Sequence, residues 1–278
     1  MEEPDQWSMF DRIVCITVDP ESTRVRALRQ NLARVRMHRM ELFVVARSTQ
    51  VENVGPDESI VNLSTICKHI DTVGPFALDL MGHHLRIARQ MYDSGAQNII
   101  VLEDDACFDL VTTARQLPDI TDWLSSHDWD IFNFGAIGFP YPFFVPVGKH
   151  VAIVKEPLLA HSYALSRAGM KKLLRFHEKT PTPHHIDKFF TLAFPRYHAA
   201  NPPCCFQTTR PALFRQALLL VPARMRHLLK KQTFKQFCVS YYYTTQISTA
   251  CIIILATSLI FVLLKRTTRR LVTYARGF

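Results

Sequence analysis

This chain of 278 residues lacks the features that mark several large classes of protein. Its seven cysteines are odd in number and scattered, with no CxxC pair, which argues against a disulfide framework and suits a reducing compartment. No arginine-rich run interleaved with aromatic residues occurs in the first two hundred residues, so we expect no nucleic-acid partner despite the net charge of +9. No internal repeat or low-complexity tract is present, and a hydrophobic content of 48% excludes a disordered chain. A chain of this length can bury a sizeable core, so one large α/β domain with additions is expected.

A strongly apolar stretch without a charged residue runs from Ile247 to Leu264. Eighteen residues of helix measure roughly 27 Å, which is close to the hydrocarbon thickness of a bilayer. Tyr241–Tyr243 precede this stretch and basic residues follow it, as at the two interfaces of a membrane span. Because soluble helices rarely lack polar residues on every face, the sequence predicts a transmembrane helix over 244–264.

The span divides the chain into four expected parts. A globular domain over 1–210 is followed by a basic, amphipathic segment over 211–243, which is suited to lie along anionic headgroups. The transmembrane helix over 244–264 and a short basic tail over 265–278 complete the chain.

The side of the membrane that the domain occupies is not decided by charge, because five basic residues flank the span on each side. The acidic N-terminus, Met1 to Asp5, leads into the first strand without an apolar signal region. We therefore expect a single-pass, C-terminally anchored protein of the endomembrane system with a cytosolic domain. The sequon Asn62-Leu63-Ser64 points to the lumen instead, but such triplets often occur by chance.

Strands and helices are predicted to alternate over the first two hundred residues. The predicted strands are 12–18, 41–46, 98–102, 129–135 and 160–166, and the predicted helices are 20–39, 78–94 and 167–177. Since strands separated by helices need crossover connections, we expect a mostly parallel central sheet flanked by helices.

An apolar run from Phe139 to Pro146 follows one of these strands and contains three prolines. Proline removes a ladder hydrogen bond, so the run is expected to form a loop or an edge hairpin rather than a central strand. It is equally compatible with a flap over a substrate and with a segment packed under the sheet.

The most unusual feature is the apolar run Ile99–Leu102, which ends in three carboxylates, Glu103, Asp104 and Asp105. A buried strand cannot continue into three charges, so its end must open to water, a cation or a ligand. Clustered carboxylates suit Mg²⁺ or Mn²⁺, which often shares its ligands with substrate phosphates. The alternative is the first turn of a helix that begins at Ala106–Phe108, and these residues alone leave both possibilities open.

Several further motifs accompany this strand in a particular order. They are Gly82-His83-His84-Leu85, Val101-Leu102-Glu103-Asp104-Asp105-Ala106, Ala160-His161-Ser162-Tyr163-Ala164-Leu165-Ser166-Arg167-Ala168-Gly169, His185-Ile186-Asp187 and Pro202-Pro203-Cys204-Cys205-Phe206-Gln207. Their order resembles that of family-25 glycosyltransferases, a group that includes lipopolysaccharide and collagen sugar transferases. The resemblance covers residues 12–210 and rests on the order of the motifs rather than on any one of them.

The resemblance implies a GT-A-like single domain that binds a nucleotide-sugar donor, expected to be a UDP-sugar, through Mn²⁺ or Mg²⁺. The acidic motif of the family falls on Glu103, Asp104 and Asp105. Asp105 is the expected principal metal ligand, Glu103 a second one, and Glu103 and Asp104 are also expected to bind the substrate. Sugar transfer to a hydroxyl of a glycan, protein or lipid-linked acceptor also needs a base that takes the proton of the acceptor. Our candidate in an inverting reaction is Asp187, whose alternative role is that of a helix-start residue.

The remaining candidates are single residues. His198 is a possible additional metal ligand. Asn133 and Gln207 suit sugar or ribose hydroxyls, and Arg24 suits the nucleotide. His161 is a candidate for the nucleotide as well, although a lone histidine on an apolar strand is more often a hydrogen-bonded core residue.

Within the first motif, His83 stands where the family has serine, so His84 is equally compatible with packing and with a substrate role.

Two other functions stay open at this stage. A catalytically inactive relative would bind nucleotide or glycan without turnover. A metal-dependent phosphoesterase would use the carboxylates equally well, although the sequence offers no second acidic cluster for a two-metal site.

Overall fold

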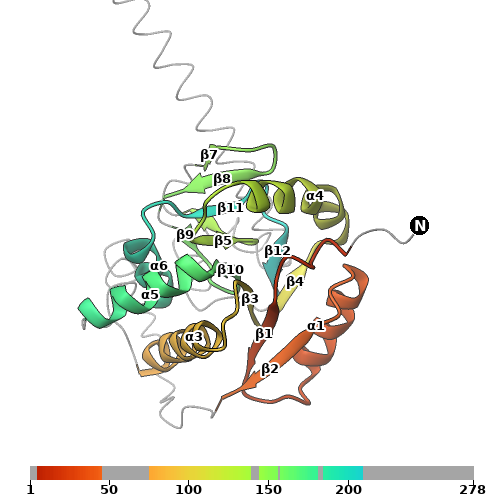
Figure 1. Cartoon of the computed structure of the whole chain (residues 1–278). Coiled ribbons are helices and arrows are strands. Elements are labelled where there is room, and N and C mark those ends of the chain that lie inside the picture. The colour runs from red at the N-terminus through yellow and green to blue at the C-terminus, as the bar shows by residue number, and fades with distance from the viewer. Residues whose placement is uncertain (1–4, 46–74, 139–143, 156, 181–183, 209–278) are drawn as a thin grey trace, which may run out of the picture. The chain divides into compact units, whose positions relative to one another are not determined.

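The computed structural model describes residues 5–45, 75–138, 144–155, 157–180 and 184–208 (Figure 1). Their central feature is an eight-stranded sheet with the order β2-β1-β3-β10-β5-β11-β8-β7. The strands of this sheet are β1 (Arg12–Thr17), β2 (Met40–Val44), β3 (Asn98–Glu103), β5 (Ile131–Asn133), β7 (Phe144–Pro146), β8 (Val151–Val154), β10 (Ser162–Ser166) and β11 (His198–Ala200). Two small antiparallel pairs accompany it, formed by β4 (Ala106–Phe108) with β12 (Cys205–Gln207) and by β6 (Ile137–Gly138) with β9 (Pro157–Leu158).

The sheet is mixed, so the expectation of a mostly parallel sheet is wrong. β1 runs parallel to β2 and β3, and β11 runs parallel to β5. β10 lies antiparallel between β3 and β5, and β8 is antiparallel to both β11 and β7. A helix normally returns the chain to the starting edge of a parallel sheet, but the described elements between β5 and β10 are all strands. β10 therefore begins at the edge where β3 ends and runs back.

Helices cover both faces of the sheet (Figure 1). On one side lie α1 (Thr23–Arg34) and α4 (Leu110–Ser126), and on the other lie α3 (Pro75–Asp93), α5 (Arg167–Lys179) and α6 (Ile186–Ala193). The mixed α/β architecture with a central sheet and flanking helices is as expected.

Local sequence explains where the helices α1 and α4 begin. The Ser22 side chain accepts a hydrogen bond from the Val25 N–H at the start of α1, and the Asp109 side chain accepts one from Thr112 at the start of α4. The segment Ala106–Phe108 forms a strand, so the helix-start interpretation of the three carboxylates is wrong. The residue that caps this helix is Asp109.

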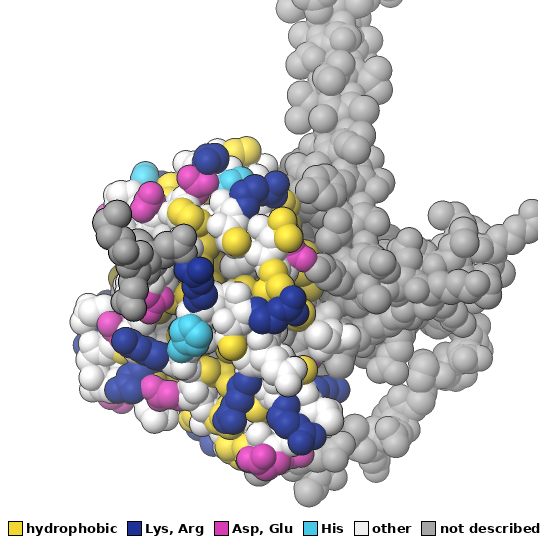
Figure 2. Space-filling view, turned by 90° about the vertical axis from the view of Figure 1, so that its right-hand side faces the viewer, with side chains coloured by type: hydrophobic (Ala, Val, Ile, Leu, Met, Phe, Trp, Pro, Cys, Tyr) yellow, Lys and Arg dark blue, Asp and Glu magenta, His cyan; other side chains and the backbone are white. Residues whose placement is uncertain are grey.

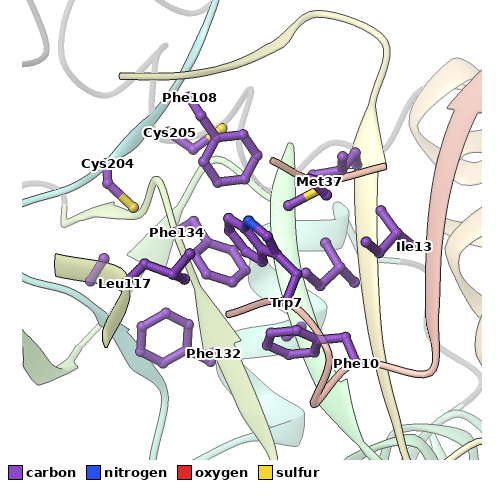
Figure 3. Packing of buried hydrophobic residues seen from close by; sticks show 14 of the residues in the cluster. Trp7, Phe10, Ile13, Met37, Phe108, Leu117, Phe132, Phe134, Cys204 and Cys205 are labelled. Atoms are coloured by element: carbon purple, nitrogen blue, oxygen red, sulfur yellow. The ribbon is translucent and has the colours of Figure 1, made fainter. Parts of the chain in front are cut away.

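An apolar core lies between the sheet and the helices α1 and α4. Trp7, Phe10, Phe108 and Phe134 pack edge to face or tilted, with ring centroids 5.6–6.4 Å apart (Figure 3). The Trp7 indole N–H donates to the carbonyl of Val35, which follows α1, at 2.8 Å. The N-terminal segment is thereby fixed to the core.

Several predictions fall wholly or partly outside the described residues. These are the transmembrane helix over 244–264, the segments over 211–243 and 265–278, the sequon at residue 62 and residues 139–143. Within the described ranges, none of the helices has the length and apolar character that a membrane crossing requires. Phe144–Pro146 forms the edge strand β7 in a hairpin with β8. For these three residues the expected edge hairpin is confirmed.

Two glycines offer a matched test of this packing. A Cβ at Gly169, in the first turn of α5, would collide with the backbone carbonyl of Asp130, whereas a Cβ at Gly82 in α3 meets nothing within 4 Å. We expect Gly169→Ala to lower the free energy of unfolding by about 2 kcal/mol or more, and Gly82→Ala to raise it by up to about 1 kcal/mol. Denaturant unfolding monitored by circular dichroism measures both, and equal effects would contradict this packing.

Candidate functional site

The carboxylates lie at the edge of the sheet where the parallel strands β1 and β3 end. Ile16 is paired with Glu103 in this register, which brings Thr17 beside Asp104. The Thr17 hydroxyl donates to Asp104 Oδ2 at 2.9 Å, and Arg24 Nη1 in the first turn of α1 lies 3.5 Å from Asp104 Oδ1. The buried strand β3 thus ends at the carboxylates, as the sequence predicts.

The three carboxylates have different surroundings. Glu103 lies on the sheet face that α3 covers, and Asp104 faces Thr17. Asp105 is only 7% exposed, and its backbone carbonyl accepts hydrogen bonds from the N–H and the hydroxyl of Thr208, at 2.8 and 3.1 Å. Among the described residues, no three His, Cys, Asp or Glu side chains are grouped closely enough to hold a metal ion by themselves.

His84, from the interior of α3, lies next to Glu103 and is fully buried. Its Nδ1 lies 2.8 Å from the Tyr163 hydroxyl, and its Nε2 lies 3.7 Å from Glu103 Oε1. Burial lowers the pKa of His84 to about 4, so the ring is neutral at neutral pH. If the tyrosine donates to Nδ1, the remaining proton of the ring is on Nε2 and faces the carboxylate.

Asp187 completes this group from the first turn of α6. Its Oδ1 accepts a hydrogen bond from the Ala160 N–H at 3.0 Å, and its Oδ2 lies 3.7 Å from His185 Nδ1. Burial raises the pKa of Asp187, although His185 and the N–H groups of Leu159 and Ala160 act in the opposite direction. We call His84, Glu103, Tyr163 and Asp187 the carboxylate–histidine cluster.

Glu103 has a pKa that lies well above that of an ordinary glutamate. Burial, first, and then the charges of Asp187 and Asp104 raise the pKa of Glu103 from 4.5 to about 7. Its side chain is 21% exposed, so the carboxyl group still reaches solvent. A carboxyl group with this pKa can accept or donate a proton at neutral pH, and a cation bound beside it would keep it ionised.

The turn at Leu159–Ala160 connects this cluster to the sheet. Leu159 has a φ of +76°, a left-handed conformation that is unfavourable for a leucine. The Asn133 side-chain amide donates to the Leu159 carbonyl at 3.0 Å, while Asp187 accepts from Ala160. Asn133 and Asp187 thus hold the turn from two directions.

The position of Asn133 corrects its predicted role in substrate binding. Its amide nitrogen also donates to the Tyr197 hydroxyl, at 2.9 Å, and its oxygen accepts from the Gly135 N–H, at 2.7 Å. The residue is completely buried. Because its side chain is enclosed and already bonded to protein groups, it supports the turn and does not reach a substrate.

His161 is also an interior residue, so its predicted contact with the nucleotide is wrong for this structure. It is fully buried and packs against Gly135, where a Cβ would lie 2.6 Å from its Nε2. Burial lowers its pKa to about 4. Its backbone carbonyl accepts from the Glu103 N–H at 2.9 Å, so His161 positions the acidic strand end through its main chain.

His198 is not brought together with the carboxylates. It lies on β11, three strands from β3, or roughly 14 Å at the usual strand spacing. Its ring lies 4.9 Å from that of Trp123 in α4, on the opposite face of the sheet from Glu103. The predicted metal set of Asp105, Glu103 and His198 is therefore not assembled.

Gln207 and Arg24 do lie at the acidic edge. Gln207 on β12 is paired with Ala106, directly after Asp105. The Arg24 side chain is 54% exposed beside Asp104. Both residues keep their predicted roles as candidates for substrate binding.

Sequence reasoning missed Tyr163 and Thr17. Period-two alternation shows which residues of β3 share a face with Glu103, and Val101 is one of them. The pairing of Tyr163 with Val101 then puts Tyr163 on this face, and this pairing is known only from the structure.

The sequence matches no family model and no curated protein. Among solved structures, the chain is similar to a glycosyltransferase involved in the glycosylation of the major capsid of PBCV-1. The identity is 11%, over 74% of this chain and 95% of that chain, with a TM-score of 0.40. It is also similar to a mannose-1-phosphate geranyltransferase from Thermus thermophilus, at 13% identity over 68% of this chain and 72% of that chain, with a TM-score of 0.38. Likenesses of this degree leave the function to be argued from the residues of the chain itself.

The raised pKa of Glu103 predicts a pH-dependent stability. Between pH 4.5 and about 7 the folded protein retains a proton that the unfolded chain has released, so the free energy of unfolding falls as pH rises. Glutamine at this position does not ionise, so Glu103→Gln removes this loss of stability. Between pH 5 and 8 we expect the free energy of unfolding of Glu103→Gln to rise by about 1–3 kcal/mol relative to that of wild type. Denaturant unfolding at each pH, in the presence of a chelator, measures the difference.

Glu178→Gln is the control for this experiment, because Glu178 lies exposed on α5 beside Arg89. Its difference from wild type should stay constant over the same pH range. His84 also makes stability depend on pH, but in the opposite direction, because its lowered pKa makes stability fall toward acid pH. The difference between wild type and Glu103→Gln isolates the contribution of Glu103, since His84 is present in both proteins. A constant difference for Glu103→Gln would contradict the raised pKa.

Proposed function

We propose that this protein is a metal-dependent glycosyltransferase that moves a sugar from a nucleotide-sugar, a UDP-sugar, to a hydroxyl of a glycan, protein or lipid-linked acceptor, with inversion. The observation that carries the proposal is the convergence of Asp187 from α6 with Glu103 at the edge where β1 and β3 end. In α/β sheets this edge is where ligands bind. The order of the motifs in the sequence supports the same reaction.

The donor set at this edge fits Mn²⁺ or Mg²⁺ that shares its ligands with a substrate. Such ions need oxygen ligands and are often bound by one or two carboxylates together with phosphate oxygens. Asp105 and Asp104 would hold the ion together with phosphate oxygens of the donor. When bound, the ion would offset the negative charge of the departing nucleoside diphosphate.

The other steps fall to side chains of the protein. Arg24, half exposed next to Asp104, is placed to bind a phosphate group. Asp187 Oδ1 is held by the Ala160 N–H, which leaves Oδ2 to take the proton of the acceptor hydroxyl. The raised pKa of Asp187 makes it a stronger base than an exposed aspartate.

The proposal includes a membrane location. The predicted span over 244–264 would anchor the chain in an endomembrane, with the domain on the cytosolic side, where nucleotide-sugars are directly accessible. A protease-protection assay on intact and permeabilised membranes tests this side: digestion of the domain without permeabilisation is expected, and protection would assign it to the lumen.

The first prediction of activity concerns Asp105. We expect the full chain, in detergent with Mn²⁺, to transfer or hydrolyse one of a panel of UDP-sugars, and Asp105→Asn to lower the rate at least about a hundredfold through loss of a metal ligand. Product formation is measured by mass spectrometry. Asp122→Asn, at an exposed position of α4, is the control and should keep full activity.

Other outcomes have distinct signatures. Calorimetric binding of UDP with Mn²⁺ but no product from any donor would indicate an inactive relative. Phosphate release from simple esters, without sugar transfer, would indicate a phosphoesterase. Equal activity of Asp105→Asn and wild type would contradict the assigned metal site.

A pair of substitutions separates two roles of Asp187. Asparagine retains an oxygen that can accept from Ala160 but cannot serve as the base, whereas alanine loses both functions. We expect Asp187→Asn to lower kcat about a hundredfold with little loss of stability, and Asp187→Ala to lower both. Steady-state kinetics and thermal unfolding measure the split, and an active Asp187→Asn would leave Asp187 as a residue that only positions the turn.

A further inference from the structure

The segment from Ser22 to Met40, which contains α1, has an unusual charge pattern. It contains six arginines and no acidic residue. All six are exposed, while Val25, Leu28 and Leu32 face the core. The exposed side of α1 and the connection that follows it are therefore a basic surface, which we call the basic surface of α1 and define by Arg26, Arg29 and Arg34 on the helix and Arg39 just before β2.

Among the described residues, no carboxylate forms an ion pair with the arginines of this surface. In the described part of the chain, none of Arg26, Arg29, Arg34 and Arg39 has a carboxylate within 4.0 Å. In contrast, Lys172 on α5 pairs with Asp130 at 2.6 Å, and Arg89 on α3 pairs with Glu178 at 2.8 Å. Figure 2 shows the side of the domain on which α1 lies, and in its lower half Lys and Arg side chains gather with acidic ones mainly at the margin.

We propose that the basic surface of α1 docks on the anionic headgroups of a lipid bilayer. Guanidinium groups bind phosphate strongly, and the residues between them on the helix, Ala27, Gln30 and Ala33, are short or uncharged. They allow a flat surface to approach the helix. Each arginine near an anionic bilayer contributes about a fivefold increase in binding.

A lipid surface is the polyanion that this chain would meet at the highest local concentration. The predicted transmembrane helix would hold the domain near a bilayer, and 38 residues separate Thr208, the last described residue, from Ile247. Nucleic-acid surfaces that combine arginine with aromatic residues are different, since this segment contains no Phe, Tyr or Trp.

Docking of α1 would determine which substrates the acidic edge meets. Arg24 in the first turn of α1 lies 3.5 Å from Asp104, so the edge adjoins the same end of the helix. A domain that rests on α1 therefore holds its carboxylates near the headgroups, within reach of a lipid-linked acceptor. This choice of acceptor rests on the proposed function, whereas the docking itself does not.

Arginine footprinting tests the docking on the full chain. The protein is reconstituted in nanodiscs of phosphatidylcholine alone, or of two parts phosphatidylcholine to one part phosphatidylserine. Phenylglyoxal modification is then read residue by residue by mass spectrometry. We expect Arg26, Arg29, Arg34 and Arg39 to react several-fold more slowly in the anionic discs, and the difference to vanish at high salt. Protein that does not enter the discs is footprinted with vesicles of the same lipids, so the result does not depend on the predicted span.

Two triple variants give the matched comparison. Removing the charges of Arg26, Arg29 and Arg34 by substitution with glutamine should weaken docking about a hundredfold, so that Arg39 reacts equally in both kinds of disc. The same loss of charge on α5, by glutamine at Lys171, Arg175 and Lys179, should leave the protection of α1 intact.

Other results would overturn the proposal. Equal reactivity of the four arginines in both kinds of disc excludes docking on lipid, and equal effects of the two triple variants show general attraction without a specific face. Protection by a single-stranded oligonucleotide or by polyglutamate, but not by anionic lipid, assigns the surface to another partner. The footprint needs no sugar transfer, so its failure is distinct from the failure of the proposed reaction.

Discussion

The turn at Leu159–Ala160 is the constraint on which the rest of the candidate site depends. It starts β10 at the edge where β3 ends, so that this strand fits antiparallel between β3 and β5. Its left-handed residue is held by the amide of Asn133 and by the carboxylate of Asp187. One residue further on, the carbonyl of His161 accepts from Glu103. The backbone that presents the acidic edge is thus fixed by two buried polar side chains.

The same turn places charge where water is scarce. Glu103 and Asp187 lie close together under partial burial, which raises the pKa of each carboxyl group. His84 stays neutral because it is buried, so it places a neutral ring rather than a full positive charge 3.7 Å from Glu103. Two neighbouring carboxyl groups with raised pKa values and no full positive charge between them are typical of sites that transfer protons or bind cations. The stability of the fold and the chemistry of the site are therefore coupled through the pKa of Glu103.

Much of the fold was predictable, but less of the site. The strand at 98–103 and the helices after Pro20 and Ser166 follow from local periodicity and capping, which depend on neighbours in the chain. The direction of β10 was not predictable in this way, because it depends on how the chain returns between β5 and β10, where all the described elements are strands. Asn133, His161 and His198 have residue types suited to binding, yet each is enclosed by strands or helices distant in sequence.

The sequence by itself determined the acidic end of a buried strand and the basic composition of the segment after Ser22, because both are local properties of charge and hydrophobic pattern. Only the tertiary structure decided which groups face one another: Glu103 with His84 and Asp187, Asp104 with Thr17 and Arg24, and His198 with Trp123. The physical reason is that pKa values and hydrogen bonds depend on distance and burial, and the pairing of strands and packing of helices set both.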